Sequence, residues 1–164
     1  MTEPTTEPTT EPTTEPTTEP TTEPTTEPTT EPGKLPDDLA ALLRTPCQCH
    51  VATLDPDGSP QLTQTWADTD GEHILINTVR GFRKLRNIER DPRVAVTIVD
   101  RERPNRYYGV KGHVIATTTD GAADGIEELA RKYLGGPYPW PGGRDQVRVA
   151  VTIEVERVIH TPQW

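Results

Sequence analysis

A four-residue Thr-Glu-Pro-Thr repeat fills residues 2–32 and withdraws that stretch from any packed core. The repeat carries eight of the 18 prolines and eight of the 26 acidic residues, and it has no aliphatic or aromatic side chain. Such a segment buries no apolar surface, so nothing offsets the chain entropy that it would lose on folding. We expect residues 1–33 to be a disordered acidic tail, either inert and solubilising or a docking or modified segment. Residues 34–164 are expected to form one domain.

Most of the excess negative charge belongs to this tail. The chain has 17 basic and 26 acidic residues, a net charge of −9, and without the eight tail glutamates the balance is 17 against 18. A nearly neutral domain with one local group of cations suits a small anionic ligand, whereas nucleic acid needs a broad basic face. No apolar run reaches membrane-spanning length. We therefore expect no nucleic-acid partner and no membrane partner.

Cys47, Cys49 and His50 form a cluster that resembles part of a metal site. A zinc site needs about four ligands, and the other three histidines are scattered along the chain. We expect instead two small buried thiols at the entrance to a strand, and no metal site. Free thiols and the lack of a signal peptide predict a cytoplasmic location.

The segment 77–96 reads as a strand end, a glycine turn, a short basic helix, a proline stop and a second strand. Five cations lie within eleven residues around the turn and helix: Arg80, Arg83, Lys84, Arg86 and Arg90. The first turn of a helix presents unpaired backbone N–H groups and the positive end of the helix dipole, which favour phosphate. The segment therefore predicts an anion site, although a solvated basic surface would have the same composition.

Alternating polarity and turn signals divide the rest of the domain into short elements. Strands are expected over residues 51–54, 61–67, 73–78, 93–100, 106–117 and 146–158. Further helices are expected over 37–44 and 120–134, with Asp37 and Asp120 as N-caps, and Gly112 is expected at a β-bulge. Six antiparallel strands joined by tight turns indicate a mainly β fold, a β-barrel with small helices.

Several short motifs occur in a fixed order: His-Val-Ala-Thr-Leu at 50–54, Asp-Pro-Asp-Gly-Ser-Pro-Gln at 55–61, Ile-Leu-Ile-Asn-Thr at 74–78, Gly-Phe-Arg-Lys at 81–84, and Arg-Asn-Ile-Glu-Arg-Asp-Pro-Arg-Val at 86–94. This order resembles the split β-barrel flavin and deazaflavin oxidoreductases, the relatives of pyridoxamine 5'-phosphate oxidase, and most closely the branch that uses coenzyme F420. The resemblance implies a six-stranded antiparallel split β-barrel of the Greek-key, FMN-binding type. It also implies a homodimer with the cofactor at the subunit interface.

The resemblance implies roles for individual residues. Family members hold the cofactor phosphate near the turn and helix, which here points to Lys84, Asn87, Arg83 and Arg80. They place the ring system against strands, where the implied hydrogen-bonding residues are Gln61, Thr63, Thr65, Asn77 and Thr78. Residues that reach the cofactor of the partner subunit are implied to be Arg106 and Tyr107.

Phe82 departs from the family pattern, because some relatives have a phosphate-binding arginine at this position. Phenylalanine cannot bind phosphate, so Arg83 or Arg80 would substitute, or the phosphate would lie differently. Tyr138 and Trp140 belong to a Gly/Pro-rich loop over 135–143. They either cover a substrate pocket or fill an apolar gap.

The sequence has no evident nucleophile–base pair or paired carboxylates, and no G-x-G-x-x-G or P-loop motif. The cofactor would then carry the chemistry, and the protein would position donor and acceptor. The resemblance implies an F420-dependent oxidoreductase that transfers a hydride from the reduced deazaflavin to an unsaturated or conjugated small-molecule substrate. Two alternatives remain open, an FMN-binding oxidoreductase of the same fold and a non-catalytic carrier of F420 or flavin.

Overall fold

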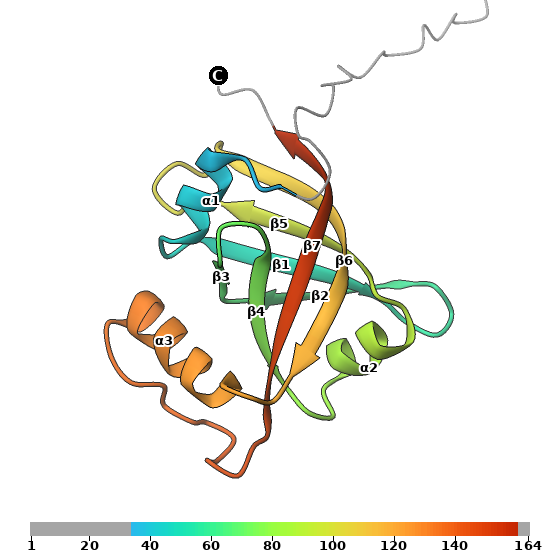
Figure 1. The fold of residues 1–164 in the computed structure, drawn as a ribbon, viewed down its shortest axis with the longest axis vertical. Helices are drawn as coiled ribbons and strands as arrows, with labels where there is room; N and C mark the ends of the chain where they lie inside the picture. The colour runs from blue at the N-terminus through green and yellow to red at the C-terminus, as the bar shows by residue number, and fades with distance from the viewer. Residues whose placement is uncertain (1–33, 161–164) are drawn as a thin grey trace, which may run out of the picture.

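The computed structural model describes residues 34–160, so the predicted acidic tail over 1–33 lies outside the described residues. The described chain forms these elements in order: α1 Asp37–Leu43, β1 Gln48–Leu54, β2 Pro60–Thr65, β3 Ala67–Thr69, β4 Ile74–Val79, α2 Arg83–Arg90, β5 Arg93–Val99, β6 Tyr107–Thr118, α3 Ala122–Leu134 and β7 Arg148–His160. The mainly β class predicted from the sequence is confirmed (Figure 1). No described helix is long and apolar enough to span a membrane.

The strands form one antiparallel sheet in the order β2-β1-β5-β6-β7-β4-β3, and this sheet curls into a half-barrel (Figure 1). The six-strand prediction is one strand short, because the strand expected over 61–67 is divided at Trp66. Thr65 pairs with Cys49 of β1, whereas Ala67 pairs with Ile76 of β4. The chain therefore leaves one edge of the sheet and joins the other at Trp66. This crossing brings the two sheet edges together.

A stretch of both edges remains unpaired where they meet. β3 pairs with β4 only along Ile74–Ile76, so the last three residues of β4, 77–79, pair with β7 on one side alone. β2 pairs only with β1 among the described strands. We call the gap between β2 and residues 77–79 the seam.

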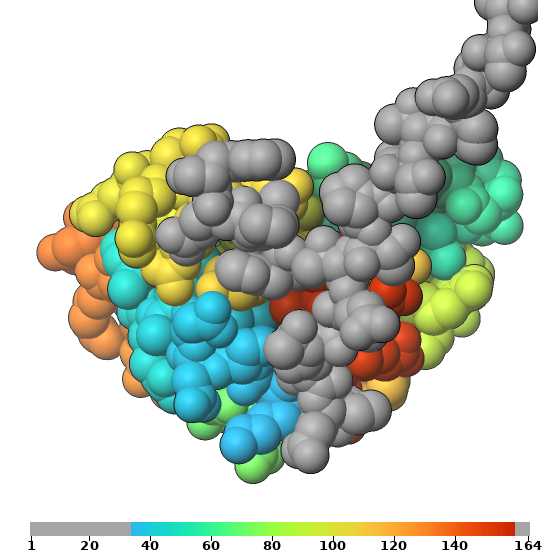
Figure 2. Space-filling view, turned by 90° about the horizontal axis from the view of Figure 1, so that it is seen from above, coloured from blue at the N-terminus to red at the C-terminus, as the bar shows by residue number. Residues whose placement is uncertain are grey.

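The core lies inside the half-barrel and follows the alternation of its strands. Val51 of β1 and Val96 and Ile98 of β5 are fully buried on one face, and Leu39 and Leu43 of α1 pack into the same cluster. Burying each such side chain stabilises the fold by about 1.5–3 kcal/mol relative to exposure. α1 lies beside the β5–β6 loop at one end of the sheet (Figure 2, blue and yellow).

The two cysteines are free and buried at the start of β1, as predicted. The Sγ of Cys47 lies 3.4 Å from the hydroxyl of Tyr133, and burial raises the pKa of the Cys49 thiol to about 12. These thiols are therefore core side chains. Within residues 34–160, no three His, Cys, Asp or Glu side chains gather to hold a metal ion.

Gly112 lies at a register shift between β6 and β7, which confirms the predicted β-bulge. A Cβ atom at this position would lie 2.2 Å from the backbone oxygen of Glu154. The bulged strand thus approaches its neighbour more closely than any side chain allows.

Both predicted N-caps are wrong by one residue. α1 begins after Pro36, whose carbonyl accepts the N–H of Ala40, and Asp37 is already helical. α3 begins after Gly121, which has a φ of 69°, rather than after Asp120. Neither cap residue makes a side-chain capping hydrogen bond, so a search for capping side chains could not locate these starts.

Candidate functional site

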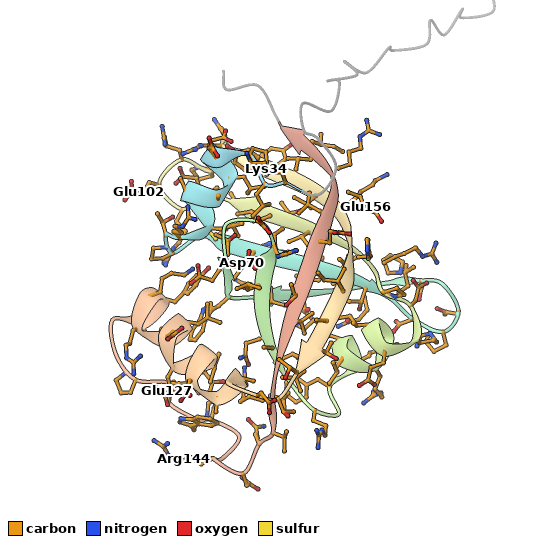
Figure 3. All side chains as sticks on the ribbon, in the orientation of Figure 1. Lys34, Asp70, Glu102, Glu127, Arg144 and Glu156 are labelled. Atoms are coloured by element: carbon orange, nitrogen blue, oxygen red, sulfur yellow. The ribbon has the colours of Figure 1, made fainter. Side chains whose placement is uncertain are left out.

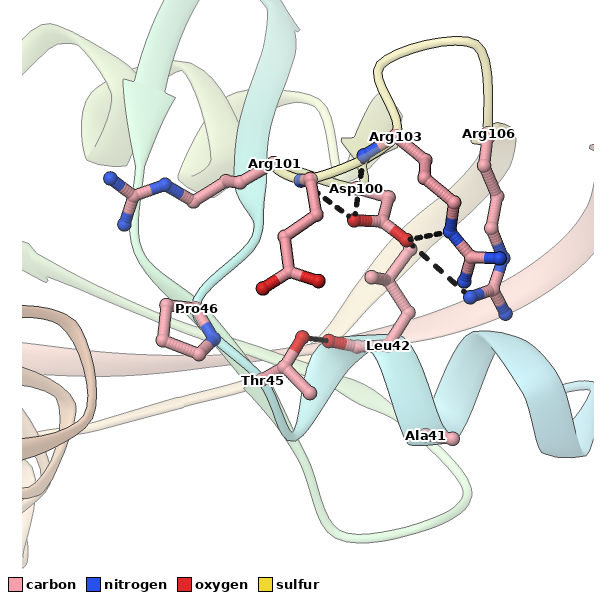
Figure 4. Close-up of a pocket in the computed structure, with 9 residues that line it drawn as sticks. Ala41, Leu42, Thr45, Pro46, Asp100, Arg101, Arg103 and Arg106 are labelled. Carbon is pink, nitrogen blue, oxygen red and sulfur yellow. Dashed lines mark hydrogen bonds and ion pairs between the residues drawn. The ribbon is translucent and has the colours of Figure 1, made fainter.

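Two cavities lie in different parts of the half-barrel. The larger one, about 590 Å³, lies between α1 and the β5–β6 loop (Figure 4). Asp100 accepts the N–H groups of Glu102 and Arg103 there, at 2.9 and 3.2 Å. Its carboxylate also pairs with the guanidinium groups of Arg103 and Arg106, at 3.4 and 3.5 Å. The buried carboxylate at this end is therefore fully engaged.

This end also holds Arg106 and Tyr107, which the sequence predicted at the partner's cofactor. Arg106 is half-buried and contacts Asp100 and the backbone oxygen of Asp38, and Tyr107 is 39% exposed at the start of β6. Within one chain, the length of β5 separates them from α2. The structure does not bring them together with the other predicted site residues, so only a second subunit would do so.

The second cavity, about 410 Å³, opens at the seam between β2, β4, β7 and α3. Its lining includes Thr65, Trp66, Asn77, Leu129, Tyr138 and Arg148. It therefore contains two of the predicted ring-binding residues, Thr65 and Asn77, together with side chains that the sequence interpretation did not assign to the cofactor.

Aromatic rings form one wall of this cavity. Trp66 stacks on Tyr133 with ring centroids 5.3 Å apart, and the edge of Tyr138 meets Trp66 at 6.0 Å. Glu127 of α3 accepts the N–H of Tyr138 and the indole N–H of Trp140, at 2.9 and 2.8 Å. Figure 3 shows Glu127 on α3 beside the loop that carries Arg144. The Gly/Pro-rich loop is thus tied to α3, and Tyr138 borders the cavity.

Arg148 is a buried cation in the wall of the cavity. It is 8% exposed, its Nε donates to Oδ1 of Asn77 at 2.7 Å, and its guanidinium lies 5.3 Å from the ring centroid of Tyr138. Asn77 in turn donates to the backbone oxygen of Ala122 at 2.7 Å, which fixes the amide. Burial lowers the pKa of Arg148. No carboxylate of residues 34–160 forms an ion pair with this guanidinium.

Lys84 of α2 is a second buried cation, 7% exposed. Burial lowers the pKa of its ammonium, and the positive charge of Arg148 lowers it further, against an opposing effect of Cys49. Among the described residues Lys84 has neither an ion pair nor a side-chain hydrogen bond. Charges that proteins bury are almost always paired, so Lys84 and Arg148 together leave room for an anion.

Asn87 and Arg83, the other predicted phosphate residues of α2, are engaged within the fold. Asn87 donates to Asp55 and Thr53 at 2.9 and 3.1 Å. Arg83 pairs with both carboxylate oxygens of Asp55, each at 2.8 Å. This network ties α2 to the end of β1. It leaves Lys84 as the predicted phosphate residue of α2 that has no internal partner.

The β2 residues predicted at the ring lie on the strand face that is turned toward the interior of the half-barrel. Thr63 pairs directly with Val51, and directly paired residues in an antiparallel sheet point to the same face. Gln61, Thr63 and Thr65 are half-buried, whereas Leu62 between them is 65% exposed. β2 therefore shows inverted polarity, with hydroxyls inside and leucine outside.

Two hydroxyls at the seam have no hydrogen-bond partner among the described residues: those of Thr63 on β2 and Thr78 on β4. Gln61 is different, since its Oε1 accepts the hydroxyl of Thr53 at 3.0 Å. A buried hydroxyl without a partner costs about 1–3 kcal/mol. These two buried oxygens therefore have unused hydrogen-bonding capacity.

Arg80 and Phe82 lie at the turn before α2. Arg80 is exposed and borders a third cavity of about 310 Å³, between α2 and the ends of β6 and β7. Phe82 is 52% exposed and precedes the first residue of the helix. Within one chain, Phe82 thus does not pack into the core.

Sequence reasoning missed Arg148 as a site residue. A signal was present, because Arg148 interrupts an apolar alternation in Val147-Arg-Val-Ala-Val151. A charge at the start of an otherwise buried strand is rarely left without a function or a partner.

Comparison with known proteins identifies the family of this fold. The family model described as pyridoxamine 5'-phosphate oxidase matches residues 35–161. A solved structure of an F420 reductase is 30% identical, with a TM-score of 0.67, and the match covers 76% of this chain and 98% of that one. No curated protein matches the sequence.

Two further solved structures share the fold at lower identity. A conserved hypothetical protein from Mycobacterium tuberculosis is 23% identical with a TM-score of 0.61, covering 80% of this chain and 92% of its own. HupZ from Group A Streptococcus is 23% identical with a TM-score of 0.55, covering 77% and 93%. With the family model matching most of the described chain, the protein belongs to the pyridoxamine 5'-phosphate oxidase family of split-barrel proteins.

Proposed function

We propose that the protein is an F420-dependent oxidoreductase that transfers a hydride from the reduced deazaflavin to an unsaturated or conjugated organic acceptor. The observation that carries this proposal is the buried ammonium of Lys84, which no carboxylate of the described chain neutralises. An anionic cofactor would supply the missing charge. The likeness to an F420 reductase at 30% identity favours a deazaflavin among the possible cofactors.

The residues of the seam fit such a cofactor. Lys84 would hold a phosphate or another anionic group of the cofactor tail, with exposed Arg80 as a second cation near the same helix. Asn87 and Arg83 would position α2 through Asp55 rather than contact the cofactor. The unpartnered hydroxyls of Thr63 and Thr78 would bond the polar edge of the ring system.

The remaining predicted residues take supporting roles in this proposal. Gln61 and Thr65 share the inward face of β2 with Thr63, and Asn77 holds the guanidinium of Arg148. The cofactor, when bound, supplies the hydride. The protein would orient donor and acceptor, with the aromatic side chains of Trp66 and Tyr138 along one wall of the cavity.

We also propose a cytoplasmic homodimer, with Arg106 and Tyr107 reaching the partner's cofactor. Both residues lie at the end of the half-barrel opposite α2. A dimer that places the α1 end of one subunit beside the seam of the other would complete two equivalent sites, as twofold symmetry requires.

A titration of the purified protein with F420 and, separately, with FMN tests the proposal. Micromolar or tighter binding of F420, seen as a change in deazaflavin fluorescence, is expected, with FMN binding more weakly. Tighter binding of FMN would favour the FMN-dependent oxidoreductase instead. If F420 binds but no conjugated acceptor speeds oxidation of its reduced form, the protein is a carrier.

A further inference from the structure

Two buried cations at the seam have no carboxylate partner among the described residues. In the proposed function, the cofactor phosphate neutralises one of them, Lys84. Lys84 projects from α2, the helix to which the proposed function assigns the phosphate. Arg148 lies on the other side, in the 410 Å³ cavity beside Asn77 and Tyr138. Its guanidinium is fixed by the hydrogen bond to Asn77 and by its contact with the ring of Tyr138. A preorganised buried guanidinium is suited to bind a planar carboxylate.

The nearby carboxylate of Glu127 is already engaged elsewhere. Both of its oxygens accept N–H groups of the loop, one from Tyr138 and one from Trp140. It therefore ties down the loop, and it makes no ion pair with Arg148. The charge of Arg148 stays available to a ligand.

Part of the cavity wall suits the apolar carbon skeleton of a ligand. Trp66 and Tyr138 present aromatic surface, and Ile126 and Leu129 of α3 add aliphatic surface. A volume of about 410 Å³ lies within the range of pockets for small organic ligands. The cavity therefore combines this aromatic and aliphatic surface with the polar side chains of Gln64, Thr65 and Asn77, and it has one fixed cation in its wall.

We infer that the acceptor is a planar conjugated acid, one whose carbon–carbon double bond is conjugated with a carboxylate that binds Arg148. This inference rests on the proposed function and names its substrate class. The acceptor gains a hydride at the β-carbon, and the π electron pair of the double bond moves toward the carboxylate oxygens. The α-carbon then takes a proton from water. The reduced deazaflavin is oxidised by the loss of that hydride, so the acceptor gains two electrons and two hydrogens.

Arg148 acts at two points of this reaction. It binds the carboxylate in the ground state, and it stabilises the additional negative charge that the carboxylate takes on as the hydride arrives. Asn77 is a positioning residue, because it orients the guanidinium through Nε.

Calorimetric titration of the full-length protein with trans-cinnamate and with its neutral amide, cinnamamide, tests the inference without turnover. Cinnamate is expected to bind about tenfold or more tightly than cinnamamide, since a charge-assisted hydrogen bond is lost with the amide. Arg148→Gln is expected to remove this preference, and Arg148→Lys to keep part of it. Thermal melting of each variant verifies that it is folded.

Titration of F420 into the same variants separates this inference from the proposed function. Arg148→Gln is expected to leave F420 affinity within about threefold. The inference is overturned if cinnamate and cinnamamide bind equally or if neither binds. It is also overturned if Arg148→Gln weakens F420 binding but leaves the preference for cinnamate unchanged. If the wild-type protein prefers the acid but does not bind F420, the proposed function fails while Arg148 remains an acid-binding residue.

Discussion

Asp100 and Lys84 lie near opposite ends of the half-barrel, and only Asp100 has oppositely charged partners among the described residues. At the α1 end, Asp100 accepts two backbone N–H groups and pairs with Arg103 and Arg106. At the seam, Lys84 and Arg148 are as deeply buried as Asp100, yet no carboxylate of residues 34–160 pairs with them. The α1 end is electrostatically complete, and the seam is not.

This difference, and not cavity size, is the reason that we propose the site at the seam. The α1 end has the larger cavity, about 590 Å³, but the buried carboxylate in its wall is already bonded within the chain. The cavity at the seam is smaller, about 410 Å³, but Arg148 in its wall has no carboxylate partner among the described residues. Lys84 and the hydroxyls of Thr63 and Thr78 are also buried without partners among the described residues. Unsatisfied burial, rather than volume, is the feature that indicates a ligand.

We expect the largest change in stability from removing the carboxylate of Asp100 at the α1 end. Asp100→Ala removes the acceptor of two N–H groups and leaves two arginines without their carboxylate. We expect a loss of about 2–3 kcal/mol in the free energy of unfolding, measured with urea. The matched control is Glu128→Ala on the exposed side of α3, expected within about 0.5 kcal/mol of wild type. Equal effects of the two variants would mean that the α1 end is not held by Asp100.

At the seam, we expect a substitution to raise the free energy of unfolding rather than to lower it. Lys84→Met replaces a buried, unpaired ammonium with an apolar chain of similar length. We expect the ligand-free protein to gain about 1–2 kcal/mol in the free energy of unfolding, because the desolvation penalty disappears. Lys111→Met, at an exposed position of β6, should change stability by no more than about 0.5 kcal/mol. A loss of stability in Lys84→Met would show that the ammonium has a partner in the fold.

The pH dependence of that gain should follow from the lowered pKa of Lys84. Burial places the folded-state pKa below the ordinary 10.5, so in the pH range between the two values the unfolded chain binds more protons than the folded one. Wild-type stability therefore rises with pH there, by less than about 1.4 kcal/mol per pH unit.

Lys84→Met lacks this proton, so its advantage over wild type should shrink as pH approaches 10.5. Burial raises the pKa of Cys49 in the folded protein to about 12, so this thiol lowers the free energy of unfolding above pH 9. The thiol is present in both proteins, and its contribution largely cancels in the difference between them. Urea unfolding of both proteins across the alkaline pH range measures the difference in their free energies of unfolding. A gap that does not change with pH would argue against a desolvated Lys84.

Much of the fold was predictable because it rests on local patterns. The alternation of β1 and β5, the basic helix and the bulge at Gly112 can all be recognised within a few residues of sequence. The division at Trp66 could not be, since it depends on which sheet edge each neighbouring residue joins.

The site was predictable in outline and not in its individual contacts. Helical spacing placed Lys84 and Asn87 on one face, and both are buried there. It could not show that Asn87 is engaged by Asp55, a residue distant in sequence, while Lys84 is left without a partner. Arg148 likewise acquires its meaning only when β7 lies beside Asn77 of β4.

The most direct test of the central claim is the affinity of F420 for wild type, Lys84→Met and Lys111→Met, measured by deazaflavin fluorescence at one ionic strength. If the seam is the anion site, Lys84→Met should weaken binding by about tenfold to a hundredfold, in spite of its greater stability, and Lys111→Met should match wild type. Equal affinity of all three proteins would contradict the assignment of Lys84 and of the seam to the cofactor.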